Sequence, residues 1–178
     1  MVLGSGVVLY GTSLFQGSTQ TEAISVSTPS VWVHTTASEG LAWGAAAIRN
    51  TGDKVLSVDK IQIRGSDIPF AQWYPDTNVT SSLFQQALNH TGWSGVGGFL
   101  VNTGGADCTL DIKVDGQADD ICANVGTGPV SLSPGQSAII YFQLSNGTLS
   151  SLDSGVSTGV NIYAGKAGAP QSVTVQGK

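Results

Sequence analysis

The first 21 residues of the chain contain no charged side chain, and this feature constrains the fold more than any other. Within them, four large side chains recur at i, i+4, i+7 and i+11, the spacing of one helix face. They are Leu3, Val7, Tyr10 and Leu14. We therefore predict that residues 1–20 form the distal part of a hydrophobic assembly helix, whose contacts come from these four residues and Val2.

The apolar part of this segment, Val2–Phe15, has fourteen residues, whereas about twenty are needed to cross the hydrocarbon layer of a membrane. It also lacks the basic start and the small-residue cleavage site of a secretory signal peptide. The segment is therefore the end of a longer hydrophobic helix, a short helix folded back on its own domain, or a core strand of that domain. The first alternative is the one that the sequence favours.

Composition favours an exported protein with one domain, residues 21–178. Charged residues make up 11% of the 178 residues, compared with about 25% in an average soluble protein, and glycine is abundant. A surface of hydroxyl and amide groups suits an extracellular β-rich protein better than a cytosolic enzyme. The net charge of -5, with scattered Lys and Arg, argues against a nucleic-acid partner.

Cys108 and Cys122 are the only two cysteines in the chain. Neither has a Cys or His at a metal-like spacing, so a disulfide is the natural interpretation in an exported protein. A bridged loop of this length contributes about 3 kcal/mol in the chain-entropy model. The alternative is a pair of buried thiols in a reducing compartment.

Alternating polar and apolar residues predict about nine short strands with turn sequences between them. The predicted strands are Thr21–Val26, Val31–Thr35, Lys54–Arg64, Cys108–Val114, Asp119–Val125, Val130–Leu132, Ser137–Leu144, Gly159–Ala164 and Gln171–Gln176, and a further apolar run covers Leu41–Ile48. This run leads into Asn50-Thr51-Gly52-Asp53, which is predicted to be a turn because its residues tolerate a left-handed φ. This pattern predicts a mainly β fold, an antiparallel Ig-like β-sandwich behind the N-terminal helix.

The apolar positions of the predicted strand Lys54–Arg64 change phase once. Leu56 and Val58 alternate in one phase, and the apolar residues after them alternate in the other. A strand with one buried face can change phase only through a bulge or a twist. We therefore predict a β-bulge at Asp59 or Lys60.

Residues 65–107 interrupt the strand pattern and predict a loop-rich insertion with one short helix, near Thr80–Leu88. Trp73 and Trp93 flank this helix in loop-like sequence, so we predict that both are exposed contact residues for a sugar or a neighbouring subunit. Trp32 and Trp43 lie in strand patterns and are predicted to be in the core.

Three N-x-S/T sequons, at Asn78, Asn89 and Asn146, are a mild excess over chance in a chain this rich in Ser and Thr. They predict glycosylation of at least one asparagine if the protein is exported. Two of the three sequons flank the predicted short helix.

The sequence offers little for catalysis, so we predict no enzyme activity, no cofactor and no metal site. His34 and His90, the only histidines, lie in no metal or triad motif. Five aspartates gather around the predicted disulfide hairpin. They are Asp107, Asp111, Asp115, Asp119 and Asp120. A calcium site and a solvated acidic strand edge are the alternatives, and the edge is favoured because the spacing is not that of an EF-hand.

The order of these parts resembles the archaeal type IV pilins and archaellins. The resemblance rests on the uncharged start, the stretch ISVSTPSVWVHTTASEGLAWGAAAIRNTGDKVLSVDKIQIRG, the strand SPGQSAIIYFQL and the closing GVNIYAGKAGAPQSVTVQ. It covers nearly the whole chain apart from the insertion 65–107. Members of the family have a basic leader and a longer helix, and this chain shows only the distal part of such a helix.

This resemblance implies a structural subunit of an extracellular, cell-surface filament for adhesion or motility. Identical subunits would polymerise through their N-terminal helices, with the β-sandwich on the outside, and the helix would lie in the membrane only before assembly. The alternative is an envelope-anchored Ig-like adhesin or carbohydrate-binding module.

Overall fold

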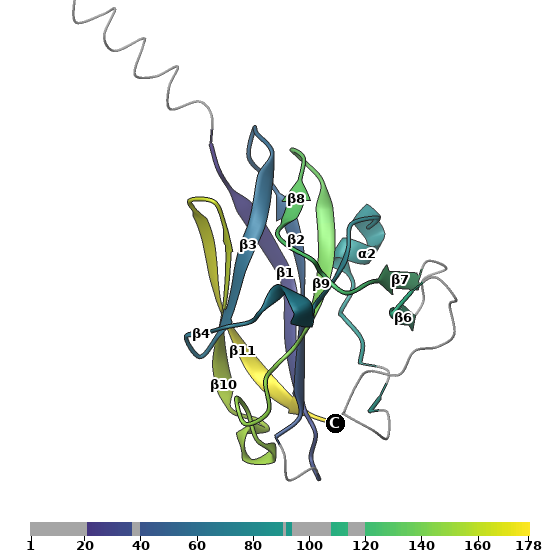
Figure 1. Ribbon diagram of the computed structural model, residues 1–178, viewed down its shortest axis with the longest axis vertical. Helices are drawn as coiled ribbons and strands as arrows, with labels where there is room; N and C mark the ends of the chain where they lie inside the picture. The colour runs from purple at the N-terminus through teal and green to yellow at the C-terminus, as the bar shows by residue number, and fades with distance from the viewer. Residues whose placement is uncertain (1–20, 37–39, 91, 94–107, 114–119) are drawn as a thin grey trace, which may run out of the picture.

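The computed structural model describes residues 21–36, 40–90, 92–93, 108–113 and 120–178 (Figure 1), and within these ranges the chain is mainly β. The elements are β1 (Ile24–Val33), β2 (Ala42–Asn50), β3 (Leu56–Ile63), β4 (Ser66–Asp67), a 3-10 turn (Phe70–Gln72), β5 (Trp73–Asp76), α2 (Ser81–Gln85), β6 (Leu110–Lys113), β7 (Asp120–Ala123), β8 (Val130–Leu132), β9 (Ser137–Gln143), a second 3-10 turn (Ser151–Asp153), β10 (Ser157–Ala164) and β11 (Ala167–Gly177).

The predicted assembly helix, with Val2, Leu3, Val7, Tyr10 and Leu14, lies outside the described residues. Among the helices that are described, none has the length and apolar character needed to cross a membrane.

Nine of the strands form one open, curled sheet with the order β4-β3-β10-β11-β1-β2-β9-β5, and β8 pairs with β3 beside this path. Strands β6 and β7 form a separate hairpin. The prediction of a purely antiparallel arrangement is wrong at one place, because β1 and β11 pair in parallel, with Val31 opposite Val175. This pair joins the two halves of the sheet.

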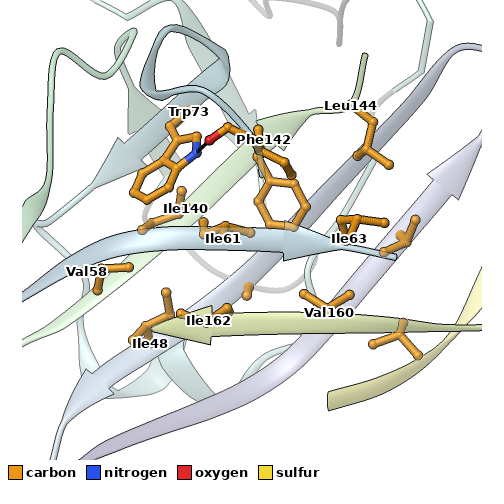
Figure 2. Packing of buried hydrophobic residues seen from close by; sticks show 14 of the residues in the cluster. Ile48, Val58, Ile61, Ile63, Trp73, Ile140, Phe142, Leu144, Val160 and Ile162 are labelled. Atoms are coloured by element: carbon orange, nitrogen blue, oxygen red, sulfur yellow. Dashed lines mark hydrogen bonds between the residues drawn. The ribbon is translucent and has the colours of Figure 1, made fainter. Parts of the chain in front are cut away.

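The inner core lies between the two halves of the curled sheet. Ile61 and Ile63 of β3 pack toward Ile140 and Phe142 of β9 (Figure 2), and all four are fully buried. Since a single apolar cluster contains residues from both halves, the curl of the sheet is what encloses the core.

A second apolar cluster covers the outer face of the half formed by β1, β2, β9 and β5. Its cover consists of Leu83 and Phe84 of α2 together with apolar residues of the β6–β7 hairpin. Strands β2 and β9 are therefore buried on both faces, which explains their continuous apolar sequences. In contrast, burial alternates along β10, whose outer face is open to solvent.

Strand β1 is one continuous strand, where the sequence predicts two. The irregularity falls between Ser27 and Ser30, where the register with β2 shifts and Thr28 has a φ of 45°. Pro29 lies in this bulge, and proline is tolerated in strands mainly at such places. The proline therefore bends the strand and does not end it.

The predicted β-bulge in β3 is confirmed. Tyr163 of β10 pairs with Lys60, but the next residue of β10, Ala164, pairs with Val58, so Asp59 is the extra residue. Asp59 and Lys60 are both exposed, and the buried positions resume at Ile61. The phase change in the sequence thus marks the bulge correctly.

The insertion contains more regular structure than the sequence predicts. Helix α2 is capped by the side chain of Thr80, which accepts a hydrogen bond from the Leu83 N–H at 3.3 Å, but it ends at Gln85, before the predicted end at Leu88. Strand β5 lies inside the predicted loop-rich insertion and pairs with β9 at the edge of the sheet, a position where a proline such as Pro75 is tolerated.

The prediction that Trp73 is exposed is wrong, because this side chain is 0% exposed in the inner core. Its indole Nε1–H donates to the Ile68 carbonyl oxygen at 2.9 Å, a bond drawn in Figure 2. Its ring packs edge-on against the Phe70 ring, with 4.8 Å between the ring centroids. Trp73 begins strand β5, whose inner face looks onto the core. Trp32 and Trp43 are buried as predicted.

Candidate functional site

The chain enters the domain at one end of the sheet, and its C-terminus lies at the opposite end (Figure 1). Residues Thr21–Ala23, here called the stem, precede β1. The turn between β2 and β3 and the turn between β10 and β11 lie at the same end as the stem. This end is where any force on the uncharged segment would reach the domain.

The side chain of Asn50, the last residue of β2, is fully buried and makes three hydrogen bonds at this end. Its Nδ2 donates to the carbonyl oxygens of Lys54 at 2.7 Å and Leu132 at 2.9 Å. Its Oδ1 accepts from the Gly52 N–H at 2.9 Å. Asn50 therefore fixes the β2–β3 turn to itself and to β8, and it satisfies backbone groups that burial would otherwise leave unpaired.

The turn held by Asn50 lies directly against the stem. The Thr51 N–H donates to the Ala23 carbonyl oxygen at 3.0 Å, and the Asp53 N–H donates to the Thr21 carbonyl oxygen at 3.2 Å. A Cβ on Gly52 would lie 2.2 Å from the Thr21 carbonyl oxygen, so only glycine allows this approach. The stem therefore packs directly against the backbone of the Asn-x-Gly turn.

Glu22 of the stem is held from a second side. Its carboxylate pairs with Lys54 Nζ at 2.6 Å and accepts the backbone N–H of Lys166 at 2.7 Å. The Lys54 hydrogen bond and then the Lys166 hydrogen bond lower the pKa of Glu22. Such exposed pairs contribute little to stability, but they place Glu22 between the β2–β3 turn and the β10–β11 turn.

These contacts define a stem anchor, the candidate functional site of the chain. It consists of Thr21, Glu22, Ala23, Asn50, Gly52, Lys54 and Lys166. The sequence predicts the Asn50-Thr51-Gly52 turn. It does not predict the hydrogen bonds between this turn and the stem, because they join segments that are far apart in the chain. The arrangement can hold a segment mechanically, and it brings no catalytic groups together.

At the opposite end, His90 lies in an aromatic cluster with Trp32, Trp93 and His34. The ring centroid of His90 is 5.3 Å from that of Trp32 and 4.6 Å from that of Trp93. His90 is 3% exposed, and its Nε2 has no hydrogen-bond partner in the described part of the chain. Burial, the nearby Lys178 ammonium and His34 lower the pKa of His90 to about 4.

We expect the stability of the domain to depend on pH through His90. Its folded pKa of about 4 lies below the ordinary value of 6.5, so between these values the unfolded state binds a proton that the folded state does not. The stability that depends on neutral His90 is complete above about pH 6.5 and is lost as the pH falls toward 4. The free energy of unfolding should fall by up to about 3 kcal/mol, because one pKa unit corresponds to about 1.4 kcal/mol.

Urea unfolding of the wild type and of His90→Phe between pH 7 and 4 tests this dependence. Phenylalanine keeps a ring beside Trp32 and Trp93 but does not titrate, so the variant should lose less stability over this interval. The carboxylate of Glu22 also loses its contribution as the pH falls through its lowered pKa, but it does so in both proteins. Parallel stability curves for the two proteins would contradict the prediction.

Trp93, predicted to be an exposed contact residue, belongs to the His90 cluster and is partly buried. Its ring packs on His34 at 5.0 Å between centroids, and its Nε1–H donates to the carbonyl oxygen of Lys178 at 3.1 Å. The Lys178 ammonium in turn donates to the His90 carbonyl oxygen at 3.3 Å. Trp93 thus ties the C-terminus to the insertion.

The three sequon asparagines differ in their surroundings. Asn78 and Asn146 are exposed, and Asn146 lies in the turn that follows β9. Asn89 is half-buried, and its carbonyl oxygen accepts a hydrogen bond from the Tyr141 hydroxyl at 2.7 Å. Asn78 and Asn146 are therefore the accessible positions for a glycan.

The predicted disulfide is present and joins Cys108 to Cys122, with 5.2 Å between their Cα atoms. The bridged hairpin docks on the sheet where the Cys122 N–H donates to Asp76 Oδ2 at 3.0 Å. The side chains of the predicted aspartate cluster all lie outside the described residues. They are Asp107, Asp111, Asp115, Asp119 and Asp120.

Among the side chains that are described, no group of three His, Cys, Asp or Glu residues is arranged to hold a metal ion. The chain matches no protein-family model, and no curated protein matches it.

Proposed function

We propose that the chain is the structural subunit of an extracellular filament of the archaeal type IV pilus or archaellum kind. Its uncharged N-terminal segment would polymerise, and its β domain, as an Ig-like sandwich, would form the outer coat. The observation that carries this proposal is that the uncharged segment leads into a stem held by the turn after β2 and by Glu22.

The stem anchor suits a subunit that bears tension. Backbone bonds from Thr51 and Asp53 and the Glu22–Lys54 ion pair hold the stem to the β2–β3 turn, and the Lys166 N–H holds Glu22 to the β10–β11 turn. A pull on residues 1–20 would thus be shared by two turns of the sheet before it reached β1.

Assembly would be driven by apolar burial. The face with Leu3, Val7, Tyr10 and Leu14 has no charge, and burial gains about 25 cal/mol for each Å² of apolar surface removed from water. Packing of this face against equivalent helices is a heterologous contact that does not close on itself, and such contacts produce helical polymers. Before assembly, a helix can remain in the membrane because its backbone groups are paired internally.

The coat role agrees with several properties of the domain. Its disulfide fits an oxidising compartment outside the cell, and its low charge and exposed sequons at Asn78 and Asn146 suit a glycosylated outer surface. The partners in this proposal are identical subunits, and the localisation is the cell surface.

The proposal is tested by immunogold electron microscopy of cells that produce the chain, with an antibody against the purified protein. We expect regular filaments labelled along their length. A variant with Leu3, Val7 and Leu14 all changed to serine should lack labelled filaments. The matched control is Val55→Ser, which removes one exposed apolar side chain of the domain and should assemble normally.

Two outcomes would contradict the filament proposal. One is wild-type label spread evenly over the cell envelope, which would favour the envelope-anchored adhesin or carbohydrate-binding module. The other is normal filament formation by the triple-serine variant, since assembly would then not depend on the apolar face.

A further inference from the structure

The solvent-facing side of β3 and β10 carries an open hollow of about 370 Å³. Its lining residues come from the bulge of β3 and the strand after it, from the end of β10 and from the turn that follows. They are Asp59, Lys60, Gln62, Tyr163 and Gly165. This half of the sheet has no helix or hairpin packed on its outer face among the described residues, so a ligand can reach the hollow.

The β-bulge places two charged groups at the hollow. In a regular strand one of two successive residues would point into the core, but the extra residue Asp59 leaves both Asp59 and Lys60 exposed. Gln62 lies further along β3, and its Nε2 donates to Asp67 Oδ1 at 2.5 Å, which fixes the amide. The hollow thus has hydrogen-bond donors and acceptors on a rigid strand.

Tyr163 supplies the aromatic wall of the hollow. It pairs with Gly168 across the β10–β11 hairpin, and a Cβ on Gly168 would lie 3.1 Å and 3.2 Å from Cδ1 and Cε1 of the ring. The absence of a side chain at residue 168 therefore lets the ring lie close to the sheet. The half-buried ring still contributes to the hollow, so part of it remains open for stacking.

We propose that this hollow binds a neutral pyranose unit of a saccharide. The C–H face of the sugar stacks on Tyr163, and its hydroxyl groups bond to Asp59, Lys60 and Gln62. The Asp59 carboxylate and the Lys60 ammonium have opposite charges, so these two lining groups together favour neither an anionic nor a cationic ligand. A neutral polyhydroxyl ligand can use both, and the net charge of -5 disfavours a nucleotide.

This inference goes beyond the filament proposal and does not depend on it, because the hollow belongs to a single copy of the chain. It also differs from the sugar contact predicted from the sequence. That prediction used Trp73, which is buried, and Trp93, which is tied to Lys178.

Saturation-transfer NMR on the full chain tests the proposal, with the protein in a zwitterionic detergent that has no sugar headgroup. The probes are the methyl glycosides of glucose, galactose, mannose and N-acetylglucosamine. We expect at least one to bind with a Kd in the millimolar range. Tyr163→Ala should weaken that binding by about tenfold or more.

Further variants separate stacking from a loss of folding. Tyr163→Phe keeps the ring and should bind within about threefold of the wild type, which corresponds to under 1 kcal/mol. Gly168→Ala should weaken binding, because the new Cβ displaces the ring. Trp93→Ala is the matched control at the other aromatic site and should bind normally.

The proposal is overturned if none of the four glycosides binds, or if Tyr163→Ala binds as well as the wild type. Loss of binding in Trp93→Ala with normal binding in Tyr163→Ala would also overturn it.

The saccharide has two possible sources, a foreign surface or an N-linked glycan on Asn78 or Asn146 of another copy. Sedimentation of glycosylated and unglycosylated chain distinguishes them. Self-association of only the glycosylated chain, reversed by the bound methyl glycoside, supports the site with another copy's glycan as its ligand. If the glycosylated and unglycosylated chains sediment equally, the ligand of the proposed site is a saccharide from a foreign surface.

Discussion

Replacing Trp73 with alanine is expected to lower the free energy of unfolding by about 3–5 kcal/mol, the range found for large aromatic side chains in cores. The indole is fully buried, packs edge-on against Phe70 and donates to the Ile68 carbonyl oxygen. Its loss would leave a cavity at the start of β5 and an unpaired carbonyl oxygen at Ile68. Since domains are stable by only about 5–15 kcal/mol, the variant should be close to unfolding.

Urea denaturation followed by circular dichroism measures this effect. Trp93→Ala is the control, because Trp93 is only partly buried and should cost clearly less. If Trp73→Ala and Trp93→Ala lose similar amounts of stability, Trp73 does not hold β5 to the core in the way described above.

The second large effect is expected for Asn50→Ala, which should cost about 2–4 kcal/mol. The substitution removes three hydrogen bonds and leaves two buried backbone groups without their partner, the Leu132 carbonyl oxygen and the Gly52 N–H. Each buried group left unpaired costs about 1–3 kcal/mol. In addition, the hydrogen bonds between the β2–β3 turn and the stem should open more often.

Two measurements on Asn50→Ala separate the local effect from the global one. Urea unfolding gives the stability, and amide hydrogen exchange of Thr51 and Asp53 reports the bonds to the stem. Asn146→Ala, in an exposed turn, is the matched control and should leave both unchanged. Exchange of the Thr51 amide at the wild-type rate in Asn50→Ala would show that the turn holds the stem without the asparagine.

Local patterns predicted the parts of the fold that depend on neighbouring residues. The phase change at Asp59 located the bulge because alternation along a strand is a local property. The chain has only two cysteines, so Cys108 and Cys122 could be paired from the sequence. Asn50-Thr51-Gly52 was recognised as a turn from its residue types alone.

The predictions that failed concern contacts between distant segments. Trp73 lies in sequence that looks like a loop, and only the pairing of β5 with β9 shows that its side chain points into the core. Likewise, nothing in the sequence indicated that α2 and the disulfide hairpin build a second apolar layer on the sheet.

The candidate sites could be predicted only in part, for the same reason. The sequence predicts the turn that follows β2, but the contact of this turn with Thr21 joins two segments that only the folded sheet brings together. Tyr163 and Asp59 are more than a hundred residues apart and meet through the β3–β10 register. No periodic pattern in a single sequence encodes such a register.

The parallel pair of β1 and β11 has a consequence for the order in which the chain matures. The first and last strands of the domain are neighbours, and β11 alone connects β10 to β1. A nascent chain from which β11 has not yet emerged therefore lacks the strand that joins its two half-sheets. Because contacts of such long sequence separation form slowly, the β1–β11 pair is expected to form late in folding.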